Sequence, residues 1–407
     1  MFALADDLSG AAETAAALMT SARSARIALS GPPYPSDPHV LVADLDSRHH
    51  PRAAELVREA LAHAAGRRVF VKVDSLLRGG VAATVAACLD APVVFAPALP
   101  VAGRTVVGGV PYIKGIPLRE TRMWHAESRP APASVAEALR GVPVAQVPLA
   151  TVRAGREVLA ETLRRAGAGG RVAVCDAETD GDLDLVAAGA LAAGPGTRLI
   201  GAGGLATALG RTLPAGKAAQ KAAQKAAPKA AGKAPGNVVA REAASPDTPL
   251  LVVVGTAHPG ATAQAELLSE HGARLLPLDT NALNAQETTA HRVRDALTTA
   301  PTVLTVAGAA DPATLTTILG AIVARALADR PAHLVLTGGE TARRVLDALG
   351  VRELTPIGQV HHGAVHCRTP LGHSVVTRPG SFGDRDSLLR IAAHLSPESF
   401  RSEERLT

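Results

Sequence analysis

The chain has 407 residues, of which 47% are hydrophobic but only 2% aromatic, so it is long enough for two domains with cores of Ala, Val and Leu. Few aromatic rings leave little surface for stacking nucleic-acid bases, and no apolar run of about 18 residues predicts a membrane span. The formal net charge is +5, and Cys88, Cys175 and Cys367 lie far apart without CxxC spacing. This argues against a disulfide framework and favours the reducing cytoplasm.

The first half alternates short Val- and Leu-rich runs with helical runs. The run before Asp6 and Asp7 is only "MFAL", and the alanine-rich stretch after them predicts a helix. Such alternation is typical of parallel strands covered by helices on both faces. Further strands are predicted at 39–46, 67–75, 91–99, 170–177 and 197–204, and further helices at 52–66 and 79–90.

Polar residues follow these apolar runs. Because open parallel sheets bind ligands at the carboxyl ends of their strands, these residues are candidate site residues. Carboxylates can accept hydrogen bonds from sugar hydroxyls, and Arg or Lys can hold a carboxylate. The pattern predicts a site for a small polyhydroxylated anion; for any single residue, helix capping is the alternative. The candidates are Asp6, Asp7, Ser9, Gly10, Asp44, Asp46, Ser47, Arg48, Lys72, Asp74, Ser75, Arg78, Gly79, Gly103 and Arg104.

Residues 214–236 form a low-complexity tract of Ala, Lys and Pro. Like charges four residues apart, together with Pro228, disfavour a helix there. We interpret the tract as a flexible solvated linker, and an electrostatic arm for nucleic acid is the less favoured interpretation. Its lysines account for the whole net charge, since 5 − 5 = 0 without Lys217, Lys221, Lys225, Lys229 and Lys233.

Three glycine-rich turns follow predicted strands in the second half: "VGTAHPG" (254–260), "LTGGET" (336–341) and "RPGSFGD" (378–384). Backbone amides freed by glycine at a helix N-terminus can cradle phosphate. This half contains neither a Walker A sequence nor G-x-G-x-x-G, so the prediction of a phosphate site depends on all three turns. Strands are predicted at 248–257, 302–306, 332–339 and 373–383, and helices at 260–273, 312–328 and 340–350.

Several histidines permit a metal interpretation, chiefly in "HHGAVHC", which ends at Cys367. The rings of adjacent histidines diverge on regular structure, so polar turns are the favoured interpretation and no metal site is predicted with certainty. The histidines concerned are His49, His50, His361, His362 and His366.

These patterns predict an α/β fold with two three-layer domains, mainly parallel sheets and a ligand cleft between the domains. We expect a first domain at 1–213, an Ala/Lys/Pro-rich linker at 214–248, a second domain at 249–396 and a disordered tail at 397–407.

The motifs together resemble the four-carbon acid sugar kinase family over nearly the whole chain. "ADDLSGAAETA" is similar to the family's opening A-D-D-[FL]-[TS]-G-A, and "KVDSLLRGG" (72–80) to K-x-D-S-T-L-R-G. "DLDSR" (44–48) and "PALPVAGRTVVGGVPYIKGIPLRET" (97–121) are similar to two further substrate-domain segments. "GTAHPGATAQ", "LTGGETARRVLDALG" and "RPGSFGDRD" resemble the turns of its nucleotide domain.

The resemblance implies an ATP-dependent kinase that uses Mg²⁺ and phosphorylates the terminal hydroxyl of threonate, erythronate or a 3-oxo-tetronate. It implies catalytic roles for Asp6, Asp7 and Asp74. The implied substrate-binding residues are Asp7, Arg48, Lys72, Asp74, Ser75, Arg78 and Arg104. The implied ATP-binding residues are His258, Gly338, Gly339, Glu340, Thr341, Gly380, Ser381, Phe382 and Gly383.

The sequence departs from the family pattern in three places. Leu76 replaces the usual Thr, His258 stands where a Ser commonly contacts nucleotide, and the first strand is very short or starts upstream. These departures keep open a sugar-acid sensor without kinase activity as an alternative. A homodimer is also possible.

Overall fold

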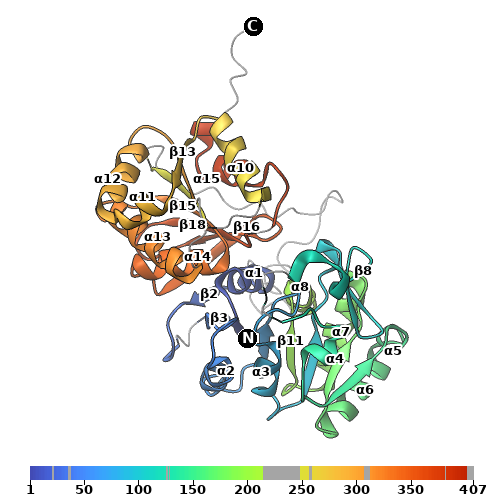
Figure 1. Ribbon diagram of the computed structural model, residues 1–407. Coiled ribbons are helices and arrows are strands. Elements are labelled where there is room, and N and C mark those ends of the chain that lie inside the picture. The colour runs from blue at the N-terminus through green and yellow to red at the C-terminus, as the bar shows by residue number, and fades with distance from the viewer. Residues whose placement is uncertain are drawn as a thin grey trace, which may run out of the picture. The chain divides into compact units, whose positions relative to one another are not determined.

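The computed structural model describes residues 1–20, 23–34, 38–124, 127, 129–213, 248–255, 259–306, 312–380 and 382–400. The chain divides into two compact units, Met1–Lys229 and Ala230–Thr407 (Figure 1). Most of the predicted linker lies outside the described residues, as do residues 401–407 of the predicted tail. Pro397–Phe400 form a short 3-10 helix, η4, so the first part of the tail expected to be disordered is ordered.

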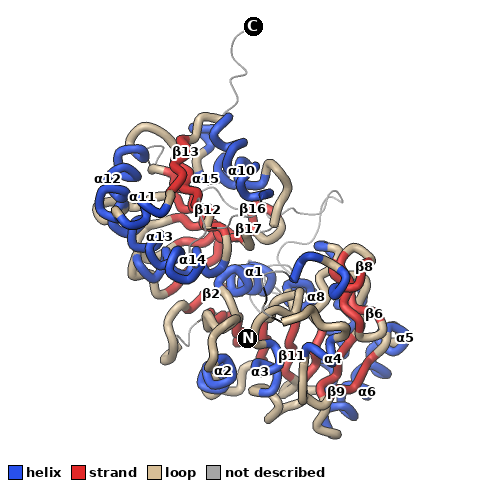
Figure 2. Tube along the Cα trace, in the orientation of Figure 1, coloured by secondary structure: helices blue, strands red, loops and turns tan. Residues whose placement is uncertain are grey.

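The first unit contains a parallel sheet in which strand follows helix along the chain (Figure 2). Every residue of β1, β3 and β4 is buried, which is typical of strands covered on both faces. This explains their unbroken apolar runs. In sheet order the strands are β2 (Ala25–Ala28), β3 (Val40–Asp44), β1 (Phe2–Ala5), β4 (Val69–Lys72), β11 (Arg198–Gly201), β5 (Val93–Ala96), β10 (Val172–Cys175) and β9 (Val144–Val147).

The helices of the first unit pack in two groups. Helices α1, α8, α7 and α6 contact one another in that order, and α2 contacts α3. A small antiparallel sheet contains β6 (Arg104–Val107), β7 (Val110–Ile113) and β8 (Ile116–Pro117). The helices are α1 (Leu8–Leu18), α2 (Ala53–Leu61), α3 (Val81–Ala86), α4 (Val135–Ala138), α5 (Leu149–Val152), α6 (Arg156–Ala168), α7 (Asp180–Ala193) and α8 (Gly203–Thr212).

The second unit has its own sheet, in which five parallel strands are followed by an antiparallel pair. In order these are β13 (Arg274–Leu278), β14 (Thr302–Val306), β12 (Leu250–Val254), β15 (His333–Thr337), β18 (Ser374–Arg378), β17 (Ala364–Arg368) and β16 (Glu353–His361). The helices are α10 (Pro259–Glu270), α11 (Thr280–Asn284), α12 (Gln286–Leu297), α13 (Pro312–Ala326), α14 (Gly339–Ala348) and α15 (Ser387–Leu395).

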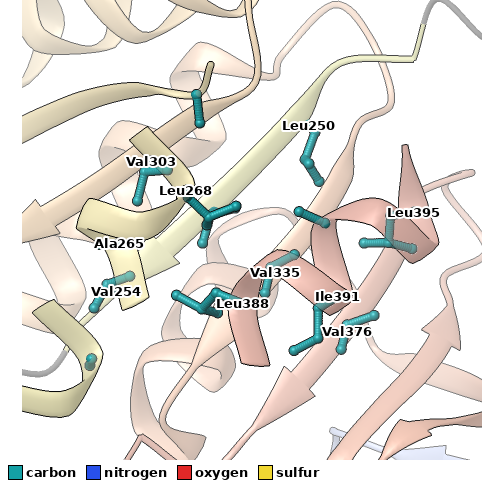
Figure 3. Packing of buried hydrophobic residues seen from close by; sticks show 14 of the residues in the cluster. Leu250, Val254, Ala265, Leu268, Val303, Val335, Val376, Leu388, Ile391 and Leu395 are labelled. Carbon is teal, nitrogen blue, oxygen red and sulfur yellow. The ribbon is translucent and has the colours of Figure 1, made fainter. Parts of the chain in front are cut away.

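One side of this second sheet packs against α10 and α15 (Figure 3). Leu268 from α10 and Ile391 from α15 are fully buried with Val303 and Val335 of the strands. Full burial of a side chain of this size contributes about 1.5–3 kcal/mol. Phe400 of η4 packs against the same cluster, which explains why this segment is ordered.

The α/β fold with mainly parallel sheets is therefore confirmed, whereas the cleft expected between the domains stays a prediction. No helix in the described ranges is long and apolar enough to cross a membrane. All three cysteines are buried free thiols.

Candidate functional site

The predicted sugar-acid residues lie at a topological switch point of the first unit. Strand β1 is paired with β3 on one side and β4 on the other, and Ala5 is in register with both Asp44 and Lys72. The chain leaves β1 towards β2 and β3, and later adds β4 on the opposite side. Ligands of open α/β sheets bind in the crevice outside the strand ends at such a point.

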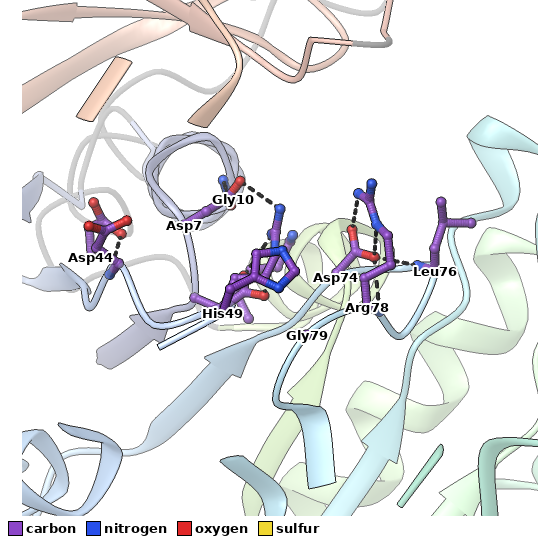
Figure 4. Close-up of polar contacts among 12 residues, drawn as sticks. Asp7, Gly10, Asp44, His49, Asp74, Leu76, Arg78 and Gly79 are labelled. Atoms are coloured by element: carbon purple, nitrogen blue, oxygen red, sulfur yellow. Dashed lines mark hydrogen bonds and ion pairs between the residues drawn. The ribbon is translucent and has the colours of Figure 1, made fainter. Parts of the chain in front are cut away.

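One guanidinium binds the two adjacent carboxylates that follow β1. Arg48 donates from Nε and Nη2 to the two oxygens of Asp6, each at 2.9 Å, and its Nη1 lies 2.9 Å from Asp7 Oδ2. The other oxygen of Asp7 accepts from the Gly10 amide at 2.8 Å and caps α1 (Figure 4). Capping, the alternative interpretation for these residues, therefore applies to Asp7, which also belongs to the cluster.

Burial alone would lower the pKa of Arg48, but the charges of Asp6, Asp7 and Asp74 and the hydrogen bonds that Arg48 donates to Asp6 raise it well above its ordinary value. Asp74 thus acts on the same guanidinium as the two aspartates after β1. The contribution of Asp74 indicates that residues from three separate turns, after β1, β3 and β4, form one electrostatic cluster.

A second carboxylate–arginine pair lies in the turn after β4. Asp74 accepts from Arg78 Nε at 2.7 Å and Nη2 at 2.8 Å, and from the amides of Leu76 and Arg78 at 3.2 Å (Figure 4). Burial opposes ionisation, but the hydrogen bond and charge of Arg78, followed by the charges of Arg48 and Arg104, hold the pKa of Asp74 far below its usual range. A carboxylate this acidic is a weak proton acceptor.

Ser75 and Arg104 contact each other beside this pair, through Arg104 Nη1 and the Ser75 hydroxyl. They line a small cavity with Leu76 and Tyr112, of about 10 Å³, which is the size of one water molecule. This cavity is too small for a four-carbon acid as the side chains lie. Leu76, the departure from the family pattern, is buried against this cavity.

Lys72 is paired with a residue that sequence reasoning missed. Its Nζ lies 3.5 Å from Glu13 Oε2, and both side chains are buried. Glu13 lies on α1 so close to the start of α8 that a Cβ at Gly203 would collide with its carboxylate. The feature of the sequence that could have indicated Glu13 is its position as the only acid within the alanine-rich "AAETAAAL".

Gly79 joins the loops that carry Arg48 and Arg78. Its φ is +75°, and a Cβ there would collide with the Arg48 carbonyl. Its amide lies 3.4 Å from Glu127 Oε2, another acid that sequence reasoning missed, and the next amide, Gly80, donates to the Arg48 carbonyl at 2.9 Å. Only glycine allows this approach at that backbone conformation.

The glycine-rich turns of the second unit follow β12, β15 and β18. Strand β12 lies between β14 and β15, so these strand ends also form a switch point. Gly338 has φ +89° and precedes α14 without a side-chain cap, which leaves the first amides of that helix available to an anion. A Cβ at Gly255 would collide with Thr341, so the first two turns are in direct contact.

The remaining predicted nucleotide residues are only partly described. Gly339 and Glu340 begin α14, and Glu340 Oε1 accepts from the Thr316 hydroxyl at 3.4 Å. Gly380, Phe382 and Gly383 follow β18, and the Phe382 ring lies 6.1 Å from that of His362. His258 and Ser381 lie outside the described residues.

The histidines that permitted a metal interpretation make ordinary polar contacts. His361 Nε2 lies 2.9 Å from the Ser387 hydroxyl, and His366 contacts His394 and Ser374, each at 3.1 Å. Within the part of the chain that the structure describes, no group of three or more His, Cys, Asp or Glu residues is arranged to hold a metal ion.

Comparison with known proteins agrees with a division into sugar and nucleotide units. A family model described as a sugar-binding N-terminal domain matches residues 1–209, and one described as a nucleotide-binding C-terminal domain matches residues 251–388. A Salmonella typhimurium protein of solved structure shares the fold with a TM-score of 0.77 at 21% identity, covering 97% of this chain and 99% of its own.

Curated relatives carry more specific names. A D-threonate kinase of Cupriavidus necator is 32% identical, with 95% of each chain covered, and one of Bordetella bronchiseptica is 32% identical, with 98% of each covered. A D-erythronate kinase of Heliobacterium modesticaldum is 32% identical over 47% of this chain and 48% of its own.

An α/β protein with a sugar-binding unit and a nucleotide-binding unit belongs to the class of two-domain sugar kinases. Within that class, the matched domains and relatives place this chain in the four-carbon acid sugar kinase family.

Proposed function

We propose that the protein transfers the γ-phosphoryl group of ATP to the terminal (C4) hydroxyl of a four-carbon acid sugar, with D-threonate as the first candidate. The observation that carries this proposal is the cluster at the end of β1, β3 and β4, where Asp6, Asp7 and Asp74 alternate with Arg48 and Arg78. The full-length relatives named D-threonate kinase favour that substrate over the half-length match to a D-erythronate kinase.

Arginine forks suit the carboxylate of the substrate, because their parallel N–H groups match its two oxygens. Arg78 and Arg48 would take this role, with further positive charge from Lys72 at the end of β4 and from Arg104, which contacts Ser75. Asp and Ser oxygens beside them accept from or donate to the sugar hydroxyls. The binding site therefore holds both parts of an acid sugar, the charge and the hydroxyls.

Among the three predicted catalytic carboxylates, Asp7 is the best placed to take the proton of the attacking hydroxyl. Its side chain is 16% exposed, against 8% for Asp6 and 7% for Asp74. Asp74 is held ionised by Arg78 and is a weak base. Asp6 is bound to Arg48 through both oxygens, whereas Asp7 contacts Arg48 through one oxygen and the Gly10 amide through the other. We therefore assign Asp7 as general base, Asp6 as a residue that orients Arg48, and Asp74 as one that orients Arg78.

The nucleotide would bind at the uncapped start of α14 and the turn after β18, where glycines allow the backbone to approach phosphate closely. Glu340 and Asp384, which belong to two of these turns, offer carboxylate oxygens, the donor type that Mg²⁺ prefers. When bound, Mg²⁺ supplies charge neutralisation during phosphoryl transfer. The free thiols agree with a reducing cytoplasm, which we also propose.

The test is ADP release from ATP and Mg²⁺ with D-threonate, D-erythronate, L-threonate and 3-oxo-tetronates, followed by assignment of the phosphorylated carbon by NMR. We expect one acid to give rapid turnover and phosphate on C4. Binding of an acid sugar without turnover of ATP would contradict the proposal and support the sensor alternative.

A further inference from the structure

Arg378, the last residue of β18, is a buried cation that the proposed site does not yet use. Its side chain is 0% exposed, and it is the largest of the fully buried side chains in the described ranges. Burying a guanidinium without a carboxylate is costly, so such a residue requires an explanation.

The partners of the Arg378 side chain, among the described residues, are all neutral. Nη2 donates to Gln264 Oε1 at 2.6 Å, and Nη1 contacts the Phe382 carbonyl and lies 3.4 Å from the Ser387 hydroxyl. In the part of the chain that the structure describes, Nε has no hydrogen-bond partner. Burial lowers the pKa of Arg378 to about 10, so the group is still a full cation at neutral pH.

The same residue links the glycine-rich turns. The Gly338 amide of the second turn donates to the Arg378 carbonyl at 2.8 Å, and the side chain of Arg378 holds the Phe382 carbonyl of the third. Gln264 bridges Arg378 to the Gly383 carbonyl at 3.2 Å from α10, the helix that leaves the first turn. One arginine is thus bonded to each element that frames the proposed phosphate site.

We propose that Arg378 is a positioning residue for nucleotide phosphates: it fixes the main chain of the third turn and places an unneutralised positive charge directly behind it. The ligand class that this arrangement recognises is a nucleoside polyphosphate, whose charge offsets the buried cation. The inference rests on the proposed ATP site. The field of a buried charge acts through the turn because few mobile dipoles screen it there.

A purely structural arginine and a positioning arginine predict different ligand dependence. We therefore compare binding of ATP, inorganic tripolyphosphate and adenosine to the full chain by calorimetry, for wild type, Arg378→Gln and Arg378→Lys. We expect Arg378→Gln to weaken ATP and tripolyphosphate about tenfold or more and leave adenosine unchanged, with Arg378→Lys recovering part of the loss because it keeps the charge.

Gln264→Glu provides a second test with a side chain of the same length, although it loses the hydrogen bond to the Gly383 carbonyl. It puts a carboxylate where Arg378 now meets a neutral amide, and so neutralises the cation without removing it. We expect weaker tripolyphosphate binding by this variant, which also covers the case in which Arg378→Gln does not fold. Arg294→Gln is the matched control, since Arg294 donates to the Arg325 carbonyl at 2.7 Å on another part of the unit.

The inference is overturned if folded Arg378→Gln or Gln264→Glu binds tripolyphosphate as tightly as wild type, or if adenosine and tripolyphosphate lose affinity equally. Failure of the wild-type protein to bind ATP or tripolyphosphate is a different result, because it contradicts the proposed ATP site itself.

Discussion

Arg48 allows Asp6 and Asp7 to stand side by side at the end of a buried strand. Two adjacent carboxylates repel each other, and one planar guanidinium with several donors can bind both. A lysine carries the same charge but lacks the planar set of N–H donors that binds two carboxylates at once. The identity of this residue therefore matters to stability as well as to binding.

Arg48→Met is expected to destabilise the first unit by about 3 kcal/mol, because removing one partner of a buried ion pair leaves unpaired charge. Chemical denaturation measures this change. Arg52→Met is the control: its side chain is 59% exposed in a surface pair with Glu55, so its effect should stay within about 0.5 kcal/mol. Equal effects of the two substitutions would contradict the role assigned to Arg48.

Asp7→Asn should lower kcat by about 10²-fold or more while the protein stays folded, because the general base is lost. Steady-state assays with the preferred acid measure this, and thermal unfolding checks the fold. If Asp74→Asn lowers kcat while Asp7→Asn does not, the base has been assigned to the wrong carboxylate.

His366 should make the second unit sensitive to acid. Burial, then the charges of His394, His333 and Arg368, lower its pKa to about 4 from an ordinary 6.5. The unfolded state therefore binds a proton at a higher pH than the folded state does. Stability is fully present above pH 6.5 and falls as the pH drops towards 4, by up to about 3 kcal/mol.

Urea unfolding of wild type and His366→Gln between pH 7 and 4.5 isolates this contribution from other titrating groups. The variant should lose less stability over that range. Parallel curves for the two proteins would show that His366 does not titrate differently in the folded and unfolded states.

The turn after β4 shows how local backbone geometry positions side chains from distant segments. Gly79 at φ +75° lets this turn touch the loop that carries Arg48, so Asp74, Arg78 and Arg48 meet. The strands themselves only bring the ends of β1, β3 and β4 to one level. The turn after β4 then brings Asp74 and Arg78 close to Arg48.

Gly79→Ala should therefore weaken sugar-acid binding as well as stability. Gly66→Ala is a matched control, because Gly66 also has positive φ (+72°) but a Cβ there meets no other atom within 4 Å. We expect Gly66→Ala to cost about 1 kcal/mol in stability with KM unchanged, and Gly79→Ala to raise KM for the acid. Equal KM values for both variants would contradict this reasoning.

Sequence pattern predicted the elements better than the contacts within the site. Buried strands such as β4 are predicted by their apolar runs. The glycine-rich turn at Gly338 is predicted by its two adjacent glycines between a strand and a helix. Glu13 was missed because a single acid in a helix is normally solvent-facing, and here its role depends on packing of α1 against α8. The β16–β17 hairpin was missed because Ile357 and Gly358 interrupt the alternation of polar and apolar residues, and the pairing of the two strands has register shifts at this point.

At the scale of the whole molecule, the two units match different family models. The first matches a sugar-binding domain and the second a nucleotide-binding domain. The low-complexity tract at 214–236, within the predicted linker, contains all of the excess charge. Neither unit requires that charge for the contacts described above.

Replacing the five lysines of 214–236 by serine removes the excess charge, since 5 − 5 = 0. We expect kcat and KM to remain within about twofold of wild type, because the charges of a solvated linker are screened at physiological salt. Gel-shift measurements at low salt test the alternative interpretation, in which the tract binds nucleic acid. A complete loss of kinase activity would contradict the linker interpretation.

The pairing of Arg48 and Arg78 with the protein's own carboxylates has a consequence for selectivity. An incoming acid exchanges one carboxylate partner for another, so its charge alone gains little. Abundant metabolites that carry a carboxylate but no hydroxyls, such as acetate or succinate, should therefore compete poorly. If acid sugars bind here as proposed, the pattern of hydroxyls should decide which acids are accepted, and the chain's own aspartates should disfavour the rest.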